Sequence, residues 1–594
     1  MIDLSPEQQA IVDAPLVPLA VVACAGSGKT FTAVHRLLEV RRRLGEARGR
    51  AALLSFSNVA VNTFRDSYRP LVESLPSSAG RQRVEIDTLD GFLTSNILRP
   101  HASRTMGCPR TPFLVSGAEP FLENKDFKFW AQPAKGDAYP VPRNEIGDVV
   151  ANFRDSVSQF HYRKHKTLIQ ITNGKAVVAR LGQIGAYTHN LGQYWALRTL
   201  QSQPLIRAAI ARRYPHILVD ESQDLGTIHQ AILLELAAAG SQISLIGDPA
   251  QGIYEFAGAD GTFLKDYGKQ AGVQSYPLTR NYRSVPSVVA LANALSNRAD
   301  TADRPVPELS HGAFFIAYKP VDRDKLIVAF QAAILSAGLS VERSAIVCRG
   351  SAMVESVAGA ELAMGQGLVK QFARAAVLRD KRRDYLGAFK SVAGCITGLL
   401  QKLGDDWLPS LIQTARHPEM KPIRREIWTF TRNPDEGLPA SSLVADTQWH
   451  PLLVQRVKAL LDRLQMQFGL LPVDKVGNKL KKTKLLNRPL QAAADLATEQ
   501  QSILRVDTVH KVKGESLDAL LYLAEKDHVE ALLRGVDTEL GRIGYVAATR
   551  ARNLLWLAIP PAALPALRPA LVSKGFVEAG ATVGTASEVA PGSA

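Results

Sequence analysis

Short apolar runs recur along the chain, and most of them end at a polar or glycine-rich turn that leads into a helical pattern. Such a run ahead of a helix is typical of a strand buried on both faces of a parallel sheet. Strands that alternate with helices predict an α/β protein with doubly wound parallel sheets. The runs are residues 19–23, 51–56, 216–219, 243–246, 345–347, 519–523 and 554–559.

Two segments, residues 99–200 and 370–497, depart from this pattern. Their strand signals are weaker, and they show helical periodicity, as between Leu453 and Leu464. We therefore expect two mainly helical insertions into the α/β cores. Residues 101–200 carry a net charge of +6 and residues 371–500 of +8, within a total of +15. A basic surface can serve solubility or nucleic-acid binding, so charge alone leaves both open.

Length and composition narrow the class of protein. With 594 residues and 46% hydrophobic residues, the chain has material for about four domains at roughly 150 residues each. Its four cysteines form no C-x-x-C pair, which argues against a zinc ribbon, an iron–sulfur cluster or a disulfide framework and favours a reducing cytoplasm. We found no apolar run of about 18 residues and no signal peptide, and therefore expect no membrane contact. The small-residue stretch at 574–594 predicts a disordered tail.

The first apolar run is followed by a phosphate-binding pattern. Residues 23–30 read ACAGSGKT and lead into a helical pattern. A strand, a glycine-rich loop and a helix N-terminus together direct backbone N–H groups at an anion. In such a loop Lys29 would reach the β- and γ-phosphates of ATP, and Thr30 would bind Mg²⁺.

A second polar group follows the run at 216–219, where residues 220–224 read DESQD. Acidic residues at the carboxyl end of a buried strand occupy the usual ligand edge of an α/β sheet. Asp220 would hold the Mg²⁺, and Glu221 would orient and deprotonate the attacking water. An acidic cluster alone more often caps a helix, but the phosphate loop upstream favours the catalytic reading.

Together with further motifs, these residues resemble a superfamily 1 DNA helicase of the UvrD/Rep/PcrA type. The matches occur in the family's order from residue 4 to residue 552. They are LSPEQ at 4–8, ACAGSGKT at 23–30, LSFSN at 54–58, DTLDGF at 87–92, DESQD at 220–224, IGDPAQGIYEFAGA at 246–259, NYRS at 281–284, TVHKVKGE at 508–515 and YVAATRAR at 545–552.

The resemblance implies roles in ATP hydrolysis. Gln8 would read the adenine and Tyr282 would stack on it, while Gln251 would sense the γ-phosphate. Arg283 and Arg550 occupy the family's positions for arginine fingers, which stabilise charge on the γ-phosphate in the transition state. The loop residues implied in nucleotide binding are Ala25, Gly26, Ser27, Gly28, Lys29 and Thr30.

It also implies contacts to single-stranded DNA. Phe56, Tyr254 and Phe256 match the positions where the family stacks bases, and Asn58 and His510 match backbone contacts. Aromatic side chains give stacking platforms for bases of any sequence. The alternative for Phe56 is core packing, since an aromatic residue after an apolar run is ordinarily buried.

Three residues depart from the family pattern. Asp90 stands where the family usually has a histidine, and Cys24 where it usually has a glycine. A thiol beside a helix N-terminus could be sensitive to oxidation. Glu515 is shifted by one position from the acid that contacts the ribose in the family, which leaves its role open.

The family architecture implies two RecA-like cores, each interrupted by an accessory domain. Core 1A would comprise residues 1–98 and 201–280, with insertion 1B at 99–200. Core 2A would comprise 281–369 and 498–573, with insertion 2B at 370–497. The densest cationic segments of the insertions, 161–166 and 475–488, would be either phosphate contacts or solvated loops.

The sequence thus predicts an ATP- and Mg²⁺-dependent DNA helicase that moves 3′→5′ on single strands, opens duplexes at single/double-strand junctions and acts near the nucleoid in repair, recombination or genome defence. An alternative is a translocase that supports a separate nuclease or repair protein, as in some anti-phage systems, with weak unwinding alone. A non-catalytic DNA-binding scaffold is less compatible with the intact motifs.

Overall fold

The computed structural model of the protein forms two compact units. The first comprises residues 1–349 and 507–594, and the second comprises residues 350–506. The structure describes residues 4–45, 49–73, 83–117, 119–154, 157–164, 167–253, 261–307, 310–350, 353–354, 357, 367–380, 383–401, 403, 407–412, 417–483, 485, 487–490 and 504–579. Within this described part, no helix has both the length and the apolar content needed to cross a membrane.

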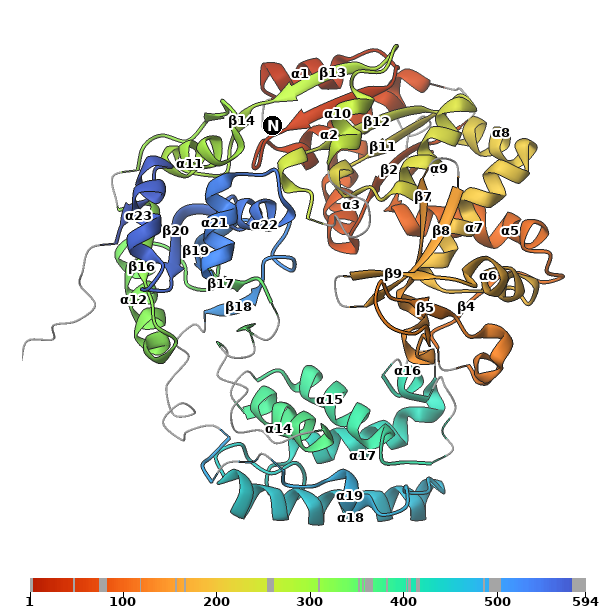
Figure 1. Ribbon diagram of the computed structural model, residues 1–594, viewed down its shortest axis with the longest axis vertical. Helices are drawn as coiled ribbons and strands as arrows, with labels where there is room; N and C mark the ends of the chain where they lie inside the picture. Colours follow the sequence, from red (N-terminus) through yellow and green to blue (C-terminus); the bar gives the residue numbers. More distant parts are fainter. Residues whose placement is uncertain are drawn as a thin grey trace, which may run out of the picture. The chain divides into compact units, whose positions relative to one another are not determined.

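The first unit contains a six-stranded parallel sheet in the order β13-β1-β12-β11-β2-β3 (Figure 1). Its inner strands are the apolar runs of the sequence, and β2 and β11 are buried at every position. The sheet therefore confirms the predicted α/β class. The strands are β1 (Leu19–Ala23), β2 (Ala51–Ser55), β3 (Val84–Thr88), β11 (His216–Val219), β12 (Gln242–Gly247) and β13 (Gln274–Leu278).

Helices connect these strands and bury apolar faces against the sheet. The first, α1 (Pro6–Asp13), begins with a capping box in which Ser5 and Gln8 satisfy each other's backbone N–H groups. Its apolar side packs beside α2 (Lys29–Leu44), the helix that follows β1. The other helices of this part are α3 (Asn58–Glu73), α4 (Leu89–Leu93), α8 (Pro204–Arg213), α9 (Thr227–Ala238) and α10 (Thr262–Tyr267).

A second six-stranded sheet in the same unit has the order β18-β17-β19-β20-β16-β21. The pairings of β17, β19, β20, β16 and β21 are parallel, as predicted for the C-terminal apolar runs. The strands are β16 (Gly312–Ala317), β17 (Ala345–Cys348), β18 (Arg505–Thr508), β19 (Leu517–Leu523), β20 (Ala551–Ile559) and β21 (Val577–Glu578). The helices around it are α11 (Pro286–Ser296), α12 (Arg323–Ser336), α21 (Lys526–Arg534), α22 (Glu539–Ala548) and α23 (Leu564–Ser573).

The segment 99–200 shares one hydrophobic core with the first sheet, so it is not a separate compact unit. Besides α5 (Arg99–Met106), α6 (Gly174–Gln183) and α7 (His189–Ser202), it contains an antiparallel sheet in the order β6-β5-β9-β8-β7. This sheet adds to the helices that the sequence predicted. Its strands are β5 (Trp130–Gln132), β6 (Tyr139–Pro140), β7 (Val149–Arg154), β8 (Val157–Lys164) and β9 (Thr167–Ile171).

The antiparallel sheet has a weak sequence signal for a physical reason. In β8 only Phe160 and Tyr162 are buried, and the residues between and around them are polar or exposed. A period of two carried by two residues is too short to stand out from a loop. A further parallel pair joins β4 (Phe113–Leu114) to β10 (Ala186–Tyr187).

The second unit is helical around its own core. Its helices are α14 (Gly367–Asp380), α15 (Tyr385–Thr397), α16 (Trp407–Ile412), α17 (Lys421–Arg432), α18 (His450–Phe468) and α19 (Val476–Lys479). The predicted helical stretch from Leu453 to Leu464 lies in α18, and its apolar residues are buried with Phe372, Phe389 and Trp449. Of the predicted tail at 574–594, residues 580–594 lie outside the described part of the chain, whereas 574–579 include β21.

Candidate nucleotide and nucleic-acid site

The turn between β1 and α2 has the backbone of an anion-binding loop. Gly26 and Gly28 have φ values of 73° and 78°, in the left-handed region that glycine favours. A Cβ atom at Gly26 would lie 2.6 Å from the Cβ of Arg283, and one at Gly28 would lie 2.8 Å from Nε2 of Gln8. Ala25 and Ser27 complete the turn, and α2 begins at Lys29 with its free N–H groups directed at the loop.

Gln8 is fixed against this loop. It is buried, and its Nε2 donates to the backbone oxygen of Ser27 at 3.2 Å. The capping box at the start of α1 holds the same side chain from the other end, through Ser5. The glutamine that the sequence predicted to read a base is therefore placed beside the phosphate loop.

Asp220 is suited to bind a divalent cation. It follows β11, is 2% exposed, and its Oδ1 has no hydrogen-bond partner among the described residues. Burial, together with the charge of Glu221, raises the pKa of Asp220 above its usual range. Thr30 lines the same cavity as Asp220. A buried carboxylate with one oxygen lacking a hydrogen-bond partner and a hydroxyl are oxygen donors of the kind that Mg²⁺ prefers.

Glu221 is held beside Asp220 in an uncommon backbone conformation, with a φ of 52°. Gln223 donates to its carboxylate. Burial opposes ionisation of Glu221, but the positive charges of Lys29 and Lys513 and the hydrogen bond from Gln223 outweigh it and lower its pKa. The pKa of Asp220 is thus raised while that of Glu221 is lowered, which leaves Glu221 ionised and able to accept a proton.

The two sheets meet at a buried polar network. Nη2 of Arg550 donates to Oε1 of Gln251 at 2.6 Å, and Nε2 of Gln251 donates to Asp248 at 2.6 Å. Nη1 of Arg283 donates to the backbone oxygen of Thr549 at 3.0 Å. Burial lowers the pKa of Arg550, and burial together with Arg550 lowers the pKa of Arg283 to about 9. The two buried guanidinium groups, of Arg283 and Arg550, would be stabilised by a bound anion.

A buried ion pair that no sequence motif predicts joins the same two sheets. Nζ of Lys513 donates to Oδ1 of Asp224 at 2.6 Å, to its Oδ2 at 2.5 Å and to the backbone oxygen of Gln251 at 3.0 Å. Burial raises the pKa of Asp224 to about 6 in spite of Lys513. Both residues lie in recognised motifs, but no local pattern pairs positions this far apart in the chain.

One cavity of about 590 Å³ connects these acids to the predicted DNA contacts. Thr30, Asp220 and Glu221 line it, and so do Phe56 and His510. Phe56 is partly buried, with its ring 5.8 Å from that of His229 in an edge-on arrangement. Part of the ring is therefore buried in protein, as the packing alternative expects, while part faces the cavity.

The remaining predicted contacts are placed differently. Asn58 begins α3 and is exposed, but it is not among the residues that line the cavity. Tyr254 and Phe256 lie outside the described residues. The backbone N–H of Tyr282 donates to the oxygen of Gly26 at 2.9 Å, its ring lies 5.8 Å from the guanidinium of Arg280, and its hydroxyl has no partner in the described part.

Comparison with known proteins shows which helicases the chain resembles. Residues 4–132 and 186–271 match the model of the UvrD/REP helicase N-terminal domain. This part of the chain therefore resembles the UvrD/Rep-type helicases. The chain is 25% identical to DNA helicase II of Haemophilus influenzae over 306 residues, which cover 50% of this chain and 41% of that protein. It is also 25% identical to ATP-dependent DNA helicase UvrD2 of Mycobacterium tuberculosis over 318 residues, 49% of this chain and 43% of that protein.

The chain spans less than half the length of these curated relatives. DNA helicase II of Salmonella typhimurium gives the same picture, with 27% identity over 308 residues, 49% of this chain and 40% of the relative. The family match covers the phosphate loop and Asp220, but it ends before Arg283, His510 and Arg550. For those three residues the support comes from their positions: Arg283 lies against the loop at Gly26, His510 lines the cavity, and Arg550 bonds Gln251 and the backbone of Glu515.

The structure places two of the residues that depart from the family pattern, Cys24 and Glu515. Cys24 is 1% exposed, and burial raises the pKa of its thiol to about 12, which opposes the predicted sensitivity to oxidation. The low exposure outweighs the helix N-terminus beside it. Glu515 lines the cavity, and its backbone oxygen accepts a hydrogen bond from Arg550 at 3.4 Å.

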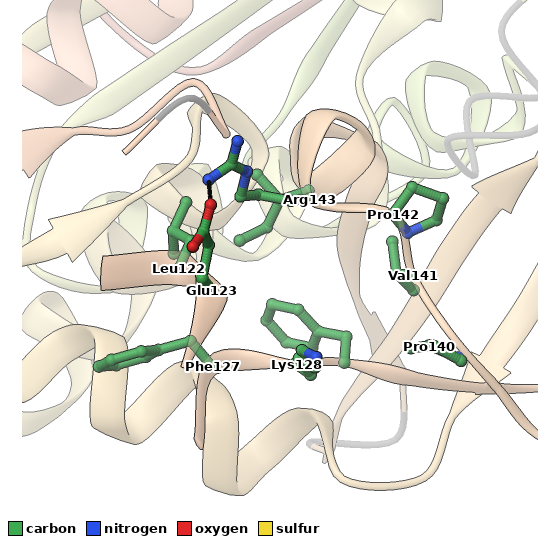
Figure 2. A pocket seen from close by; sticks show the side chains of 10 residues that line it. Leu122, Glu123, Phe127, Lys128, Pro140, Val141, Pro142 and Arg143 are labelled. Carbon is green, nitrogen blue, oxygen red and sulfur yellow. Dashed lines mark hydrogen bonds and ion pairs between the residues drawn. The ribbon is translucent and has the colours of Figure 1, made fainter. Parts of the chain in front are cut away.

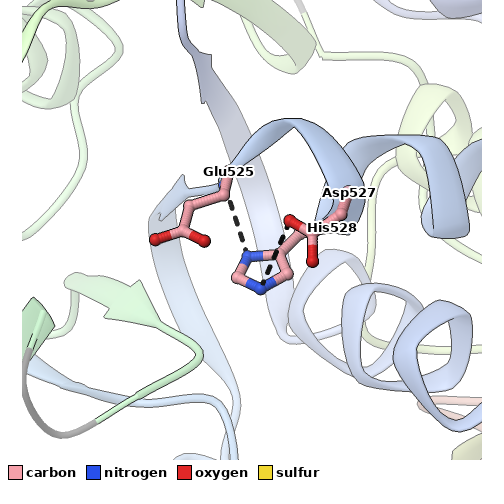
Figure 3. Close-up of side chains that lie close together, drawn as sticks. All are labelled: Glu525, Asp527 and His528. Atoms are coloured by element: carbon pink, nitrogen blue, oxygen red, sulfur yellow. Dashed lines mark hydrogen bonds and ion pairs between the residues drawn. The ribbon is translucent and has the colours of Figure 1, made fainter.

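Other pockets and clusters lie apart from this site. A cavity of about 320 Å³ in the segment 99–200 is lined mainly by apolar side chains, and an ion pair between Glu123 and Arg143 lies at its edge (Figure 2). Glu525, Asp527 and His528 bring their side chains together in a pattern that could hold a metal (Figure 3). Glu525 and His528 form the capping box of α21, which accounts for their proximity.

Proposed function

We propose that the protein is a DNA-dependent ATPase that moves 3′→5′ along single-stranded DNA and unwinds duplex DNA. The observation that carries the DNA-dependent ATPase is the single cavity shared by Thr30, Asp220 and Glu221 at one end and by Phe56 and His510 at the other. The 3′→5′ direction and the unwinding of duplex DNA follow from the family resemblance. A change in phosphate contacts at one end of such a cavity can alter the space for a strand at the other. This is the requirement for coupling hydrolysis to movement.

The chemistry at the nucleotide end follows from the residues present. Lys29 and the N–H groups at the start of α2 would bind phosphates. Glu221, whose pKa is lowered, would accept a proton from the attacking water, while Arg283 and Arg550 would stabilise the charge on the γ-phosphate. Thr30 and Asp220 would hold Mg²⁺, which would neutralise part of the negative charge of the phosphates.

Gln251 would connect the phosphate to the DNA. Its side chain bonds Arg550 and Asp248, and its backbone oxygen accepts from Lys513. Movement of Arg550 toward a γ-phosphate therefore disturbs a residue tied to both sheets. At the other end of the cavity, Phe56 would stack on a base, and His510 would bind the backbone. We extend the base-stacking role to Tyr254 and Phe256 from the family resemblance alone.

The domain assignment is part of the proposal. Residues 1–98 and 201–280 would form core 1A, residues 281–369 and 498–573 core 2A, and residues 99–200 and 370–497 the accessory insertions 1B and 2B. The two parallel sheets and the separate helical unit at 350–506 support this division. The basic insertions would meet the single/double-strand junction, with the protein acting in the cytoplasm at the nucleoid.

The test is ATP hydrolysis with and without single-stranded DNA. Stimulation by DNA is expected for the wild type. Lys29→Ala should abolish turnover through loss of phosphate binding, and Glu221→Gln should lower kcat by about 10²–10⁴, the contribution of a general base, with ATP binding retained. Glu525→Gln is a matched control, because it removes an exposed carboxylate of the capping box on α21. Unchanged hydrolysis in both site variants would contradict the assignment.

Duplexes with one single-stranded tail then test direction and unwinding. Unwinding from a 3′ tail supports the 3′→5′ assignment, and unwinding from a 5′ tail alone contradicts it. The alternative is a translocase that supports a separate nuclease or repair protein. It predicts DNA-stimulated hydrolysis and displacement of a bound protein from single-stranded DNA with little strand separation. A scaffold predicts DNA binding without hydrolysis.

A further inference from the structure

Three side chains from two helices converge on the carboxylate of Asp90, which lies in α4. Nε2 of His229 is 3.0 Å from Oδ1, Nε2 of Gln193 donates to Oδ1 at 3.0 Å, and Nε2 of His189 is 3.1 Å from Oδ2. An ionised carboxylate can only accept hydrogen bonds. Each Nε2 therefore carries its hydrogen toward Asp90, and Nδ1 is the other ring nitrogen of each histidine.

The two histidines differ in accessibility. The side chain of His229 is 8% exposed and packs edge-on against Phe56. The side chain of His189 is 66% exposed, at the first residue of α7. Both line the large cavity that also contains Phe56 and His510. His189 is thus the histidine of the pair that a strand in the cavity can reach.

The contact with Asp90 also sets the charge of His189. Burial opposes ionisation of Asp90, but the hydrogen bonds from His189 and His229 lower its pKa, so Asp90 is an anion at neutral pH. The same hydrogen bond raises the pKa of His189. A protonated imidazole has a hydrogen on both ring nitrogens, so His189 keeps one N–H for Asp90 and gains a second donor at Nδ1.

We infer that His189, positioned by Asp90, is a further DNA-contact residue that donates from Nδ1 to a backbone phosphate of the single strand. The inference rests on the proposed function, because it requires the strand to enter this cavity. It also gives a reason for the departure at Asp90. The resemblance places a histidine there, whereas in this chain an aspartate stands at that position and imidazoles reach the cavity from α7 and α9.

Several other charged or titratable groups face the same space. Two of them are linked to His189: Asp90 bonds it directly, and His229 bonds the same carboxylate of Asp90. Tyr187 lines a smaller cavity with His189, and burial raises the pKa of its hydroxyl, which therefore stays neutral. The remaining groups that line the large cavity are Arg163, Asp220, Glu221, Asp224, His510, Lys511, Lys513 and Glu515. Because His510 is another histidine that lines this cavity, the test must separate it from His189.

The experiment measures binding of a labelled oligothymidylate to the full chain by fluorescence anisotropy, without nucleotide, between about pH 6 and about pH 8.5, the range where histidine titrates. For the wild type, affinity should fall as pH rises. The slope of log K against log salt should be steeper by about 0.7 at the acidic end, the value for one phosphate contact on a single strand.

His189→Gln should remove this extra slope and weaken binding at the acidic end by about tenfold, equivalent to about 1.4 kcal/mol. Asp90→Asn keeps the imidazole but removes the charge that favours its protonation, so the fall in affinity should move to lower pH. His35→Gln is a control on α2, since His35 bonds the backbone oxygen of Phe31 and does not line the cavity.

The outcomes are distinguishable. A His189→Gln protein with the wild-type pH dependence and salt slope overturns the inference and leaves a purely structural tie between α7 and α4. If that variant does not fold, as judged by its Tm, an unshifted pH profile in Asp90→Asn overturns it instead. A wild-type chain that does not bind the oligonucleotide at all overturns the proposed function, and the inference with it.

Discussion

Arg550 and Gln251 are joined by a hydrogen bond of 2.6 Å between a guanidinium Nη2 and a side-chain amide oxygen, both of them buried. Arg550 lies between α22 and β20 of the second sheet, and Gln251 lies in the turn after β12 in the first. The amide nitrogen of Gln251 donates a hydrogen bond to Asp248. To reach a phosphate, Arg550 must therefore exchange its hydrogen bond to the neutral amide of Gln251 for a contact with the charged phosphate. Nucleotide binding can thereby change the contact between the two sheets.

Arg550→Lys should abolish most hydrolysis while leaving ATP binding in place. Lysine keeps the charge but lacks the planar fork that bonds Gln251 and a phosphate together. Loss of an arginine finger lowers the rate by about 10³–10⁵. The measurement is DNA-stimulated kcat, with nucleotide affinity determined separately.

Arg552→Lys is the matched control for this change. Arg552 lies two residues away and pairs with Asp518 at 3.7 Å, at a half-exposed position. Exposed pairs contribute about 0–1 kcal/mol, so its kcat should stay close to that of the wild type. Equal rates for Arg550→Lys and Arg552→Lys would show that Arg550 does not act on the γ-phosphate.

Lys513→Met should destabilise the first unit by about 3–5 kcal/mol, because it leaves Asp224 buried without its cation. Lys513 also opposes the rise in the pKa of Asp224, which is about 6 with the lysine present. Without the lysine this pKa rises further, so Asp224 takes up a proton near neutral pH and the destabilisation grows as pH increases. Denaturant unfolding at several pH values measures this dependence.

The double variant Lys513→Met, Asp224→Leu should recover part of the loss, since an apolar pair removes the buried charge altogether. Lys269→Met is the control, because Lys269 pairs with Asp266 at a site where both side chains are more than half exposed. It should change the free energy of unfolding by less than about 1 kcal/mol. A similar cost for Lys513→Met and Lys269→Met would contradict the importance of the buried pair.

Phe56→Ala should weaken binding of single-stranded DNA by about 1–3 kcal/mol, the range for one base stacked on an aromatic ring. Phe56→Tyr keeps the ring and should retain most of the affinity. Because Phe56 also contacts His229, both variants need a Tm beside the binding curve. Unchanged affinity in a folded Phe56→Ala protein would assign Phe56 to packing alone.

The central strands were predictable because they are apolar on both faces. The run at 216–219 coincides with β11, and the run at 19–23 with β1. The edge strands were not found. In β13 a single residue, Leu278, is buried, and β3 alternates acidic with apolar residues, so neither has a continuous apolar run.

The site was predictable where a motif is local and was not where it depends on distant residues. The loop at Lys29 and the acids at Asp220 could be located from a few neighbouring positions. The pair of Lys513 and Asp224 joins positions 289 residues apart, and periodicity carries no information about such a contact. His189 and His229 have no sequence signal of their own, except that Asp90 replaces the family's histidine.

His216 should make the fold sensitive to acid. It is 6% exposed at the start of β11, and burial, assisted by the charge of Arg36, lowers its pKa to about 4. The unfolded chain, with a histidine pKa of about 6.5, binds this proton more readily. The stability from neutral His216 is therefore fully present above about pH 6.5 and is lost as pH falls toward about 4, by at most about 3 kcal/mol. Thermal unfolding at about pH 7.5 and about pH 5 should show a smaller fall in Tm for His216→Gln than for the wild type or for His35→Gln. An equal fall in all three would mean that other groups govern the acid sensitivity of this sheet.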